Sequence, residues 1–227
     1  MKSLIIIPAY NEEACIEQTV RDILEHAPNF DYIVINDCSK DRTKEICEKN
    51  HFHYIDLPVN LGIGGAVQTG YKYACNHGYD YAVQVDGDGQ HDPRFPEQML
   101  QVMQEKKLDM LIGSRFITKE GFQSSGLRRT GIKYFTWLIR LLTGKTITDP
   151  TSGLRMINKD IIQYFAKEYP RDYPEPESTV RLIRHKRKIE EVPVIMRERA
   201  EGVSSLSSVR HSVYYMIKVS IAILVEK

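Results

Sequence analysis

The sequence predicts an α/β protein built on a mostly parallel sheet. Short apolar and β-branched runs, such as Leu4–Ile7 and Tyr32–Ile35, alternate with longer stretches of helical periodicity. Strands separated by helices of about 10–15 residues are typical of parallel sheets. Polar residues follow several of the strand-like runs directly. With 227 residues, the chain has room for one large domain, or for one domain and a tail.

The elements of the first half follow from periodicity and capping. Ile16, Val20 and Ile23 fall on one face of the first expected helix. Asp41 is a suitable N-cap for the second helix, and Pro96 suits the start of the fourth. The expected strands are Leu4–Ile7, Tyr32–Ile35, His53–Leu57, Tyr81–Val85 and Met110–Ile112, and the expected helices are Glu12–His26, Asp41–Cys47, Ala66–Asn76 and Pro93–Lys106.

The second half is less regular. Polar or Pro-rich composition predicts loops at Thr118–Arg129, Arg171–Glu177 and Arg197–Ser208. Between and after them we expect helices at Thr130–Leu142, Lys159–Glu168, Val180–His185 and Val209–Val225, and strands at Leu154–Ile157 and Ile189–Met196. We therefore expect one domain over residues 1–208, with halves 1–115 and 116–208, and a tail helix in 209–227.

The composition excludes several classes of protein. Hydrophobic residues make up 42% and charged residues 27%, which argues against disorder and against a coiled coil. The 31 Lys and Arg nearly balance the 30 Asp and Glu, so no overall positive field favours nucleic acid. The four cysteines form no CxxC pair, which is typical of reduced thiols in a cytosolic protein. Since the sequence shows neither a signal peptide nor a run of about 20 apolar residues, we expect a cytoplasmic protein.

The polar strand ends predict a binding crevice, because ligands of parallel sheets bind at the carboxyl ends of the strands. Asp86 and Asp88 flank one glycine there, and two such carboxylates can converge on Mg²⁺ or Mn²⁺, with Gln90 as a candidate further ligand. Such a metal would stabilise the charge that develops as a diphosphate leaves. A lone Asp-Gly-Asp is more often a surface turn, but the preceding strand and the context DGDGQHDP favour the metal.

Three other segments are candidates for nucleotide contacts. In Pro8–Glu12 the aromatic ring can stack on a base and the carboxylate can accept hydrogen bonds, although a strand end with a helix cap explains the segment equally well. Asp37 is a candidate for base or ribose contact, with helix capping as the alternative. Asn60–Ala66 resembles a phosphate-binding loop but matches neither a Walker A motif nor GxGxxG, so its glycines can equally serve a tight turn.

Five motifs in this order, PAYNE, NDCSKD, NLGIGGA, VDGDGQHDP and IGSR, resemble glycosyltransferase family 2 over about residues 3–160. Together with DPTSGLR at Asp149–Arg155, they are most similar to the dolichyl-phosphate mannose synthase-like branch, which makes polyprenyl-phosphate sugars. The resemblance implies a GT-A fold, a nucleotide-diphospho-sugar donor, most often a UDP-sugar, and inversion at the anomeric carbon. It also implies that Pro8, Tyr10, Glu12 and Asp37 contact the nucleoside, that Asp86 and Asp88 lie at the metal and diphosphate, and that Arg115 faces phosphate.

The acceptor follows partly from chemistry. A phosphomonoester has a second pKa of about 6 and is largely deprotonated at neutral pH, so it needs cationic positioning rather than a general base. Arg115, Arg128, Arg129 and Arg155 are the candidates for that role. Asp149 is the candidate active-site carboxylate of this half, or else a turn residue before Pro150.

An alternative reaction is transfer to a saccharide or glycolipid hydroxyl in cell-surface polysaccharide synthesis, which needs a base. Glu175 or Glu177 is a candidate for that base, or both only favour the start of a helix. A nucleotidyltransferase would carry a basic glycine-rich loop after the first strand, where this chain has PAYNE. A candidate function from a different class is that of an inactive membrane-bound scaffold. The intact motif of Asp86 and Asp88 argues against it.

The tail helix raises the question of a membrane. Val209–Val225 is apolar nearly all round and carries Arg210, His211 and Lys218. This pattern fits peripheral contact with the inner face of the cell membrane, and equally a helix packed on the sheet or in a homodimer. A small membrane protein is a further candidate partner.

Overall fold

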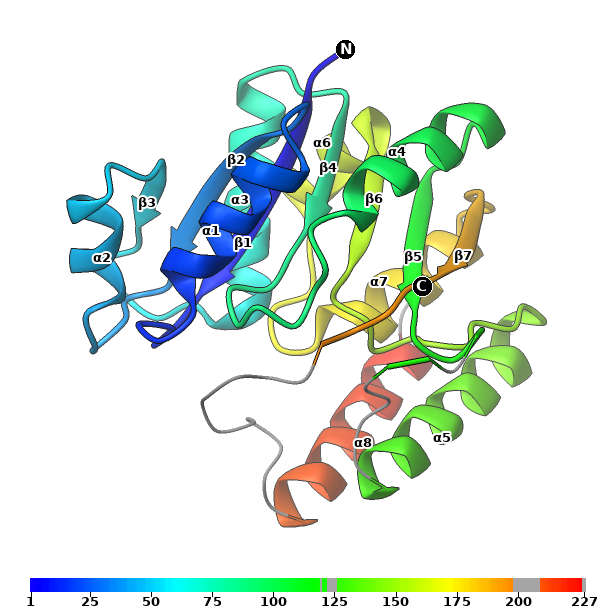
Figure 1. Ribbon diagram of the computed structural model, residues 1–227. Helices are drawn as coiled ribbons and strands as arrows, with labels where there is room; N and C mark the ends of the chain where they lie inside the picture. Colours follow the sequence, from blue (N-terminus) through cyan, green and yellow to red (C-terminus); the bar gives the residue numbers. More distant parts are fainter. Residues whose placement is uncertain (119, 122–125, 198–208, 226–227) are drawn as a thin grey trace.

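The chain folds around one seven-stranded sheet with helices on both faces (Figure 1). The structure is a computed structural model that describes residues 1–118, 120–121, 126–197 and 209–225, with the backbone alone at 126–128 and 209–213. The predicted α/β class with a mostly parallel sheet is confirmed. The strands are β1 Ser3–Ala9, β2 Asp31–Asn36, β3 Tyr54–Asp56, β4 Tyr81–Gln84, β5 Met110–Ser114, β6 Arg155–Asn158 and β7 Ile189–Pro193. The helices are α1 Ile16–His26, α2 Thr43–Lys49, α3 Gly62–Asn76, α4 Phe95–Lys106, α5 Gly126–Thr143, α6 Lys159–Lys167, α7 Pro174–Arg184 and α8 Val209–Val225.

The strands lie in the order β3-β2-β1-β4-β6-β5-β7. Only β6 is antiparallel to its neighbours, β4 and β5. It belongs to the second half of the chain, yet it lies between two strands of the first half. The expected halves 1–115 and 116–208 therefore contribute interleaved strands to one sheet.

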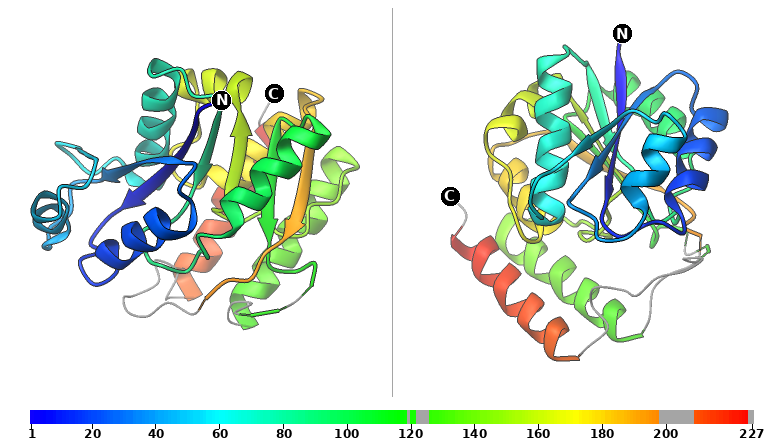
Figure 2. Two further views of the ribbon diagram at one scale, coloured as in Figure 1. Left: turned by 45° about the horizontal axis from the view of Figure 1, so that its top comes forward. Right: turned by 90° about the vertical axis from the view of Figure 1, so that its left-hand side faces the viewer.

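The sheet is buried because its strands present apolar side chains to both faces. Leu4 and Ile6 of β1 pack on the face covered by α3, α6 and α7. Ile5 and Ile7 point to the opposite face, which α1 and α4 cover. Figure 2 shows these helix layers on either side of the sheet. The two covered faces leave the strand ends as the accessible edge.

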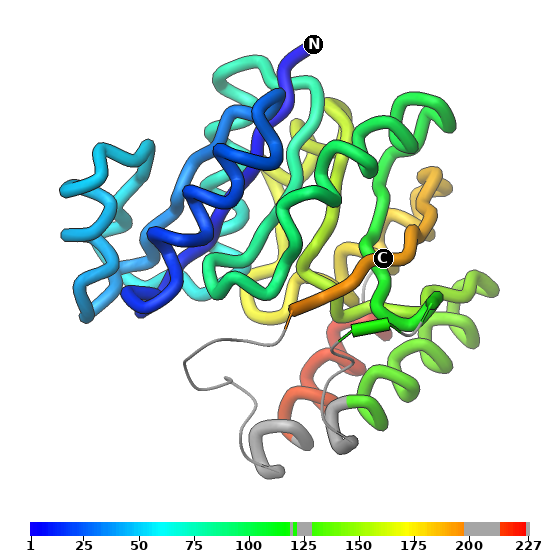
Figure 3. The backbone as a smooth tube through the Cα atoms, viewed as in Figure 1, coloured from blue at the N-terminus to red at the C-terminus, as the bar shows by residue number. Residues whose placement is uncertain are grey.

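Helices α5 and α8 pair beyond the carboxyl ends of the parallel strands, where Figures 2 and 3 show them side by side. Phe135 of α5 meets Tyr215 of α8 edge to face, with ring centroids 5.4 Å apart. Val219 and Ile223 of α8 are buried. The tail helix thus packs on the protein through one face. Of the helices that the structure describes, none is long and apolar enough to cross a membrane.

Candidate active site

The PAYNE segment and the Asp86–Asp88 turn lie side by side. The Gly87 N–H donates to the Pro8 carbonyl at 3.3 Å, and the Thr19 hydroxyl of α1 donates to the Gly87 carbonyl at 3.2 Å. A Cβ on Gly87 would lie 3.1 Å from the Pro8 carbonyl oxygen, so a glycine suits this close approach. The ends of β1 and β4 thus form one continuous edge.

Asp86 is held in place by two neighbours. Gln84 Nε2 donates to Asp86 Oδ1 at 2.8 Å, and the Asp86 backbone N–H donates to His91 Nδ1 at 3.0 Å. Because Nδ1 accepts that bond, neutral His91 carries its proton on Nε2, which lies 3.8 Å from Asp86 Oδ2. The His91 side chain is buried and holds the Asp86 backbone, while Gln84 holds the Asp86 carboxylate.

Gly153 brings the second-half motif against the same carboxylate. A Cβ at this position would lie 2.9 Å from Asp86 Oδ2 and 3.0 Å from Gln84 Nε2. Only a residue without a side chain allows the loop before β6 to come so close to Asp86. Gly153 lies within the motif DPTSGLR, but spacing in the sequence gives no signal of this contact.

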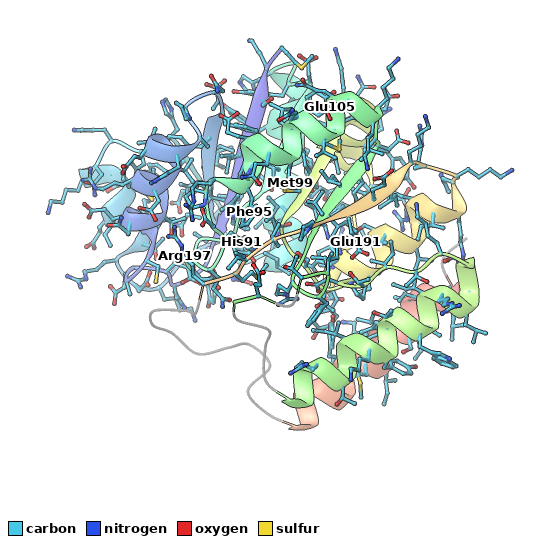
Figure 4. All side chains as sticks on the ribbon, turned by 45° about the vertical axis from the view of Figure 1, so that its right-hand side comes forward. His91, Phe95, Met99, Glu105, Glu191 and Arg197 are labelled. Atoms are coloured by element: carbon cyan, nitrogen blue, oxygen red, sulfur yellow. The ribbon has the colours of Figure 1, made fainter. Side chains whose placement is uncertain are left out.

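Asp88 and Gln90 form the outer part of the turn. Asp88 Oδ1 accepts the Gln90 N–H at 3.1 Å. The Gln90 side chain donates to the Arg197 carbonyl at 3.4 Å, and the Arg197 N–H donates back to the Gln90 carbonyl at 2.9 Å. In Figure 4, Arg197 lies beside His91, just after β7. Gln90 thus ties the turn to the segment after β7, and its coordination of a metal stays a prediction.

The donor set fits a hard divalent cation carried by a diphosphate. Asp86 and Asp88 offer carboxylate oxygens, which Mg²⁺ and Mn²⁺ prefer. Within the described part of the chain, no group of three or more His, Cys, Asp or Glu residues gathers as a metal cage. Two carboxylates at an accessible edge therefore suit a metal that takes its remaining ligands from phosphate oxygens.

The nucleoside candidates lie at the ends of β1 and β2. Tyr10 is 42% exposed and is therefore accessible to a ligand. Asp37 is buried, and its Oδ1 accepts the Leu61 N–H at 2.7 Å, directly before α3. Burial raises the pKa of the Asp37 carboxyl. The helix-capping alternative for Asp37 is thus present in the structure, and its nucleoside contact, like those of Pro8 and Glu12, stays a prediction.

The glycine-rich segment is the first turn of α3 and not a loop. The helix begins at Gly62, whereas the sequence predicted a start at Ala66. A Cβ on Gly64 would lie 2.2 Å from the carbonyl oxygens of Pro170 and Arg171, and the Gly64 N–H donates to the Arg171 carbonyl at 3.0 Å. Gly64 therefore serves close packing of α3 against this segment.

Arg115 and Asp149 form a buried ion pair. Arg115 Nε and Nη2 donate to the two Asp149 oxygens at 2.6 and 2.7 Å, and both side chains are at most 5% exposed. The two side chains therefore face each other, and phosphate contact by Arg115 and an active-site role for Asp149 stay predictions. Asp149 is a positioning residue for Arg115.

Glu191 of β7 supports the same pair, although no motif in the sequence pointed to it. Its carboxylate accepts the Thr148 and Asp149 N–H groups at 2.7 and 2.9 Å. Burial raises the pKa of Glu191, and the nearby Asp149 charge raises it further. In Figure 4, Glu191 lies apart from His91. Consecutive glutamates in a strand point to opposite faces, so only the fold shows that Glu191 points inward.

Arg155 makes structural contacts, and its predicted contact with phosphate stays untested. Its side chain is fully buried, and its guanidinium donates to the Ser152 and Pro150 carbonyls, both at 2.7 Å, and to the Thr179 hydroxyl at 2.8 Å. It also donates to the Glu175 carbonyl. Arg155 therefore joins the loop before β6 to the first turn of α7.

The remaining candidates lie on helices. Arg129 is exposed on α5, and the Arg128 side chain lies outside the described residues. Glu177 lies in the first turn of α7, 3.6 Å from Arg181. Acidic residues stabilise a helix N-terminus, so the helix-start alternative for Glu177 is the one the structure favours. Phosphate contact by Arg129 and a base role for Glu177 stay untested.

Comparisons with known proteins identify the family. The family described as Glycosyl transferase family 2 matches residues 4–165. The chain is 32% identical to the UDP-N-acetylglucosamine–dolichyl-phosphate N-acetylglucosaminyltransferase of Methanococcus voltae, with 84% of this chain and 83% of that one covered. It is 29% identical to the undecaprenyl-phosphate mannosyltransferase of Micrococcus luteus, with 91% and 88% covered.

The fold has solved counterparts. Glucosyl-3-phosphoglycerate synthase of Mycobacterium tuberculosis, solved with Mn²⁺, UDP and phosphoglyceric acid, is 17% identical, with a TM-score of 0.75 over all of this chain and 79% of that one. This similarity confirms the predicted GT-A fold. The chain belongs to glycosyl transferase family 2 and is a glycosyltransferase of the polyprenyl-phosphate sugar transferase branch.

Proposed function

We propose that the protein transfers a sugar from a nucleotide-diphospho-sugar, a UDP-sugar by preference, to polyprenyl phosphate at the inner face of the membrane. The observation that carries the proposal is the edge where the Asp86–Asp88 turn, the PAYNE segment and Gly153 meet. The names of the two relatives support a lipid phosphate as acceptor.

In the proposed reaction, an acceptor phosphate oxygen attacks the anomeric carbon, the bond from that carbon to the diphosphate breaks, and the nucleoside diphosphate leaves with inversion. Asp86 and Asp88 would hold Mg²⁺ or Mn²⁺, which neutralises charge on the leaving diphosphate. Gln84 holds the Asp86 carboxylate, and His91 holds the Asp86 backbone. Tyr10, Glu12 and Asp37 are the proposed nucleoside contacts.

The pairing of the candidate base carboxylates with arginines favours a phosphate acceptor over a hydroxyl. A hydroxyl acceptor needs a general base, but Asp149 is held by Arg115 and Glu177 lies beside Arg181. A phosphomonoester needs no base near neutral pH, because its second pKa is about 6.

The test combines purified protein, Mg²⁺ or Mn²⁺, a panel of UDP- and GDP-sugars and polyprenyl phosphate in detergent. We expect release of nucleoside diphosphate, a sugar-bearing lipid by mass spectrometry, and loss of both with EDTA. Asp88→Ala should lower turnover by roughly a hundredfold or more while the fold is kept. Asp160→Ala, at an exposed position on α6, is the matched control. Near-normal activity of Asp88→Ala would contradict the metal assignment, and transfer to a saccharide hydroxyl would contradict the acceptor.

A further inference from the structure

Arg197, in the segment just after β7, contacts residues from two other parts of the chain. Its Nη1 donates to Asp22 Oδ2 of α1 at 3.0 Å, although 175 positions separate the two residues in the sequence. Its Nη2 lies 3.9 Å from Asp92 Oδ2, in the segment between β4 and α4. Figure 4 shows Arg197 beside His91 of that segment. Arg197 therefore joins α1, the segment after β4 and the segment after β7.

The backbone of Arg197 binds the turn that carries Asp88. The Arg197 N–H donates to the Gln90 carbonyl at 2.9 Å, and Gln90 Nε2 donates to the Arg197 carbonyl at 3.4 Å. Beside this pair, Met196 forms an antiparallel bridge with His91. The Gln90 N–H in turn donates to Asp88 Oδ1 at 3.1 Å. A path of hydrogen bonds therefore runs from Arg197 through Gln90 to the Asp88 carboxylate.

Helix α1 supports this turn at two places. Thr19 Oγ1 donates to the Gly87 carbonyl at 3.2 Å, and Asp22 holds the Arg197 guanidinium. Residues three apart in a helix lie on the same face, so both contacts come from one side of α1. Through Arg197, the support that α1 gives to the turn reaches from Gly87 to Gln90.

The segment after β4 also gathers negative charge. Asp86, Asp88 and Asp92 follow one another within a few positions. The pKa of the buried Asp92 carboxyl is lowered, first by its hydrogen bond with Arg94 and further by the charge of Arg197, so Asp92 is ionised at neutral pH. Like charges at short range repel one another. A cation at position 197 therefore favours a turn in which these carboxylates lie close together.

We infer that Arg197 is a positioning residue for the Asp86–Asp88 turn: its contact with Asp22 holds Gln90 in place, and Gln90 holds the Asp88 carboxylate. The inference rests on the proposed function, which assigns this turn to Mg²⁺ or Mn²⁺. Groups that orient a metal ligand change the affinity for the metal without touching it. The Arg197 side chain is 44% exposed, and ion pairs of this kind add little to stability. Loss of the contact should therefore lower metal affinity and leave the fold intact.

Binding of Mn²⁺ tests the inference without turnover. The full chain is titrated with Mn²⁺ at saturating UDP and, in parallel, GDP, and the electron paramagnetic resonance signal of free Mn²⁺ reports binding. Arg197→Gln and Asp22→Asn should each weaken binding by roughly fivefold to tenfold, and the double variant by no more, since both remove one contact. Arg197→Lys keeps a cation near Asp22 and should recover part of the affinity. Arg21→Gln, which removes an exposed ion pair with Glu17 on the same helix, is the matched control.

Hydrogen exchange separates positioning from a general loss of stability. In Asp22→Asn the amides of Gln90 and Arg197 should exchange faster, while the urea midpoint and the protection of β1 stay as in the wild type. Loss of protection in β1 as well would show a role in folding and overturn the inference.

The remaining outcomes separate this inference from the proposed function. Equal Mn²⁺ affinity in the wild type, Arg197→Gln and Asp22→Asn overturns the inference alone, and so does an equal loss in Arg21→Gln. A wild type that binds no Mn²⁺ with either nucleotide contradicts the metal assignment of the proposed function, and the inference falls with it.

Discussion

Arg155 is a candidate phosphate ligand because of its charge, yet its contacts in the structure stabilise the fold. Its guanidinium lies among carbonyl and hydroxyl oxygens contributed by the loop before β6 and by α7. Burying a cation is tolerable when so many acceptors surround it. In a sequence, an arginine after a polar turn looks the same whether it faces a ligand or the interior. Only the fold decides between the two.

Arg155→Met should lower the free energy of unfolding by at least about 3 kcal/mol, because several buried acceptors lose their donor. Urea denaturation measures this change, and Arg187→Met at an exposed position is the control. A variant of wild-type stability whose only defect is a raised KM for the lipid phosphate would restore Arg155 as a phosphate ligand.

Gly153 is the second residue at which the fold gives a specific expectation. Gly153→Ala places a methyl group 2.9 Å from Asp86 Oδ2, so the carboxylate must move. We expect the affinity for Mn²⁺ with nucleoside diphosphate to fall roughly tenfold, as when a group that orients a metal ligand is removed.

The control for this variant is Gly131→Ala on α5, where a Cβ meets only the Met216 sulfur at an ordinary 3.8 Å. It should keep its affinity and gain about 0.5–1 kcal/mol in stability, because alanine favours a helix over glycine. Calorimetric titration and urea denaturation measure both quantities. Equal nucleotide affinity in the two variants would show that Asp86 tolerates displacement.

At the scale of elements, periodicity predicted most of the structure. The tail helix was predicted with the bounds it has, Val209–Val225, and the strands lie within a few residues of their predicted positions. The start of α7 was not predicted, because the many proline and acidic residues of Arg171–Glu177 are typical of a loop. Helices begin well with Pro in the first turn and acidic residues beside it, so Pro174 and Glu175 mark that start.

The position of the candidate site could be predicted from the sequence, but the hydrogen-bond partners of its side chains could not. Motif order identified Asp86, Asp88 and the PAYNE segment, which lie together at one edge. The partners of the arginines depend on contacts between distant segments, such as Arg115 with Asp149 and Glu191 with the Asp149 backbone. Residue type and local spacing carry no information about which of several carboxylates will face an arginine.

Deleting 209–227 should destabilise the protein, because α8 buries Val219 and Ile223 against its neighbours. Loss of two fully buried aliphatic side chains costs about 3 kcal/mol or more. Denaturation of the truncated chain measures the loss, with the full chain as reference. Unchanged stability would show that α8 contributes nothing to the packed core. Since the deletion exposes apolar surface that α8 covers in the full chain, point variants on α8 are the better test of membrane binding.

At the scale of the whole molecule, the sheet order makes the first 115 residues depend on the rest of the chain for strand pairing. In a fragment of residues 1–115, β5 has no neighbouring strand, because β6 separates it from β4 in the full chain. We expect hydrogen exchange to show no protection of Met110–Ser114 in this fragment, whereas the full chain protects them. Protection in the fragment would mean that β5 can pair without β6.

The position of β6 also sets the order in which the sheet can close during synthesis. The strands β3, β2, β1 and β4 adjoin one another and leave the ribosome first. The β4 edge then stays open until residues 155–158 emerge, more than seventy residues after β4 ends. An unpaired apolar strand edge is a template for pairing with other chains. The nascent protein therefore depends on β6 to protect the very strand whose end carries Asp86.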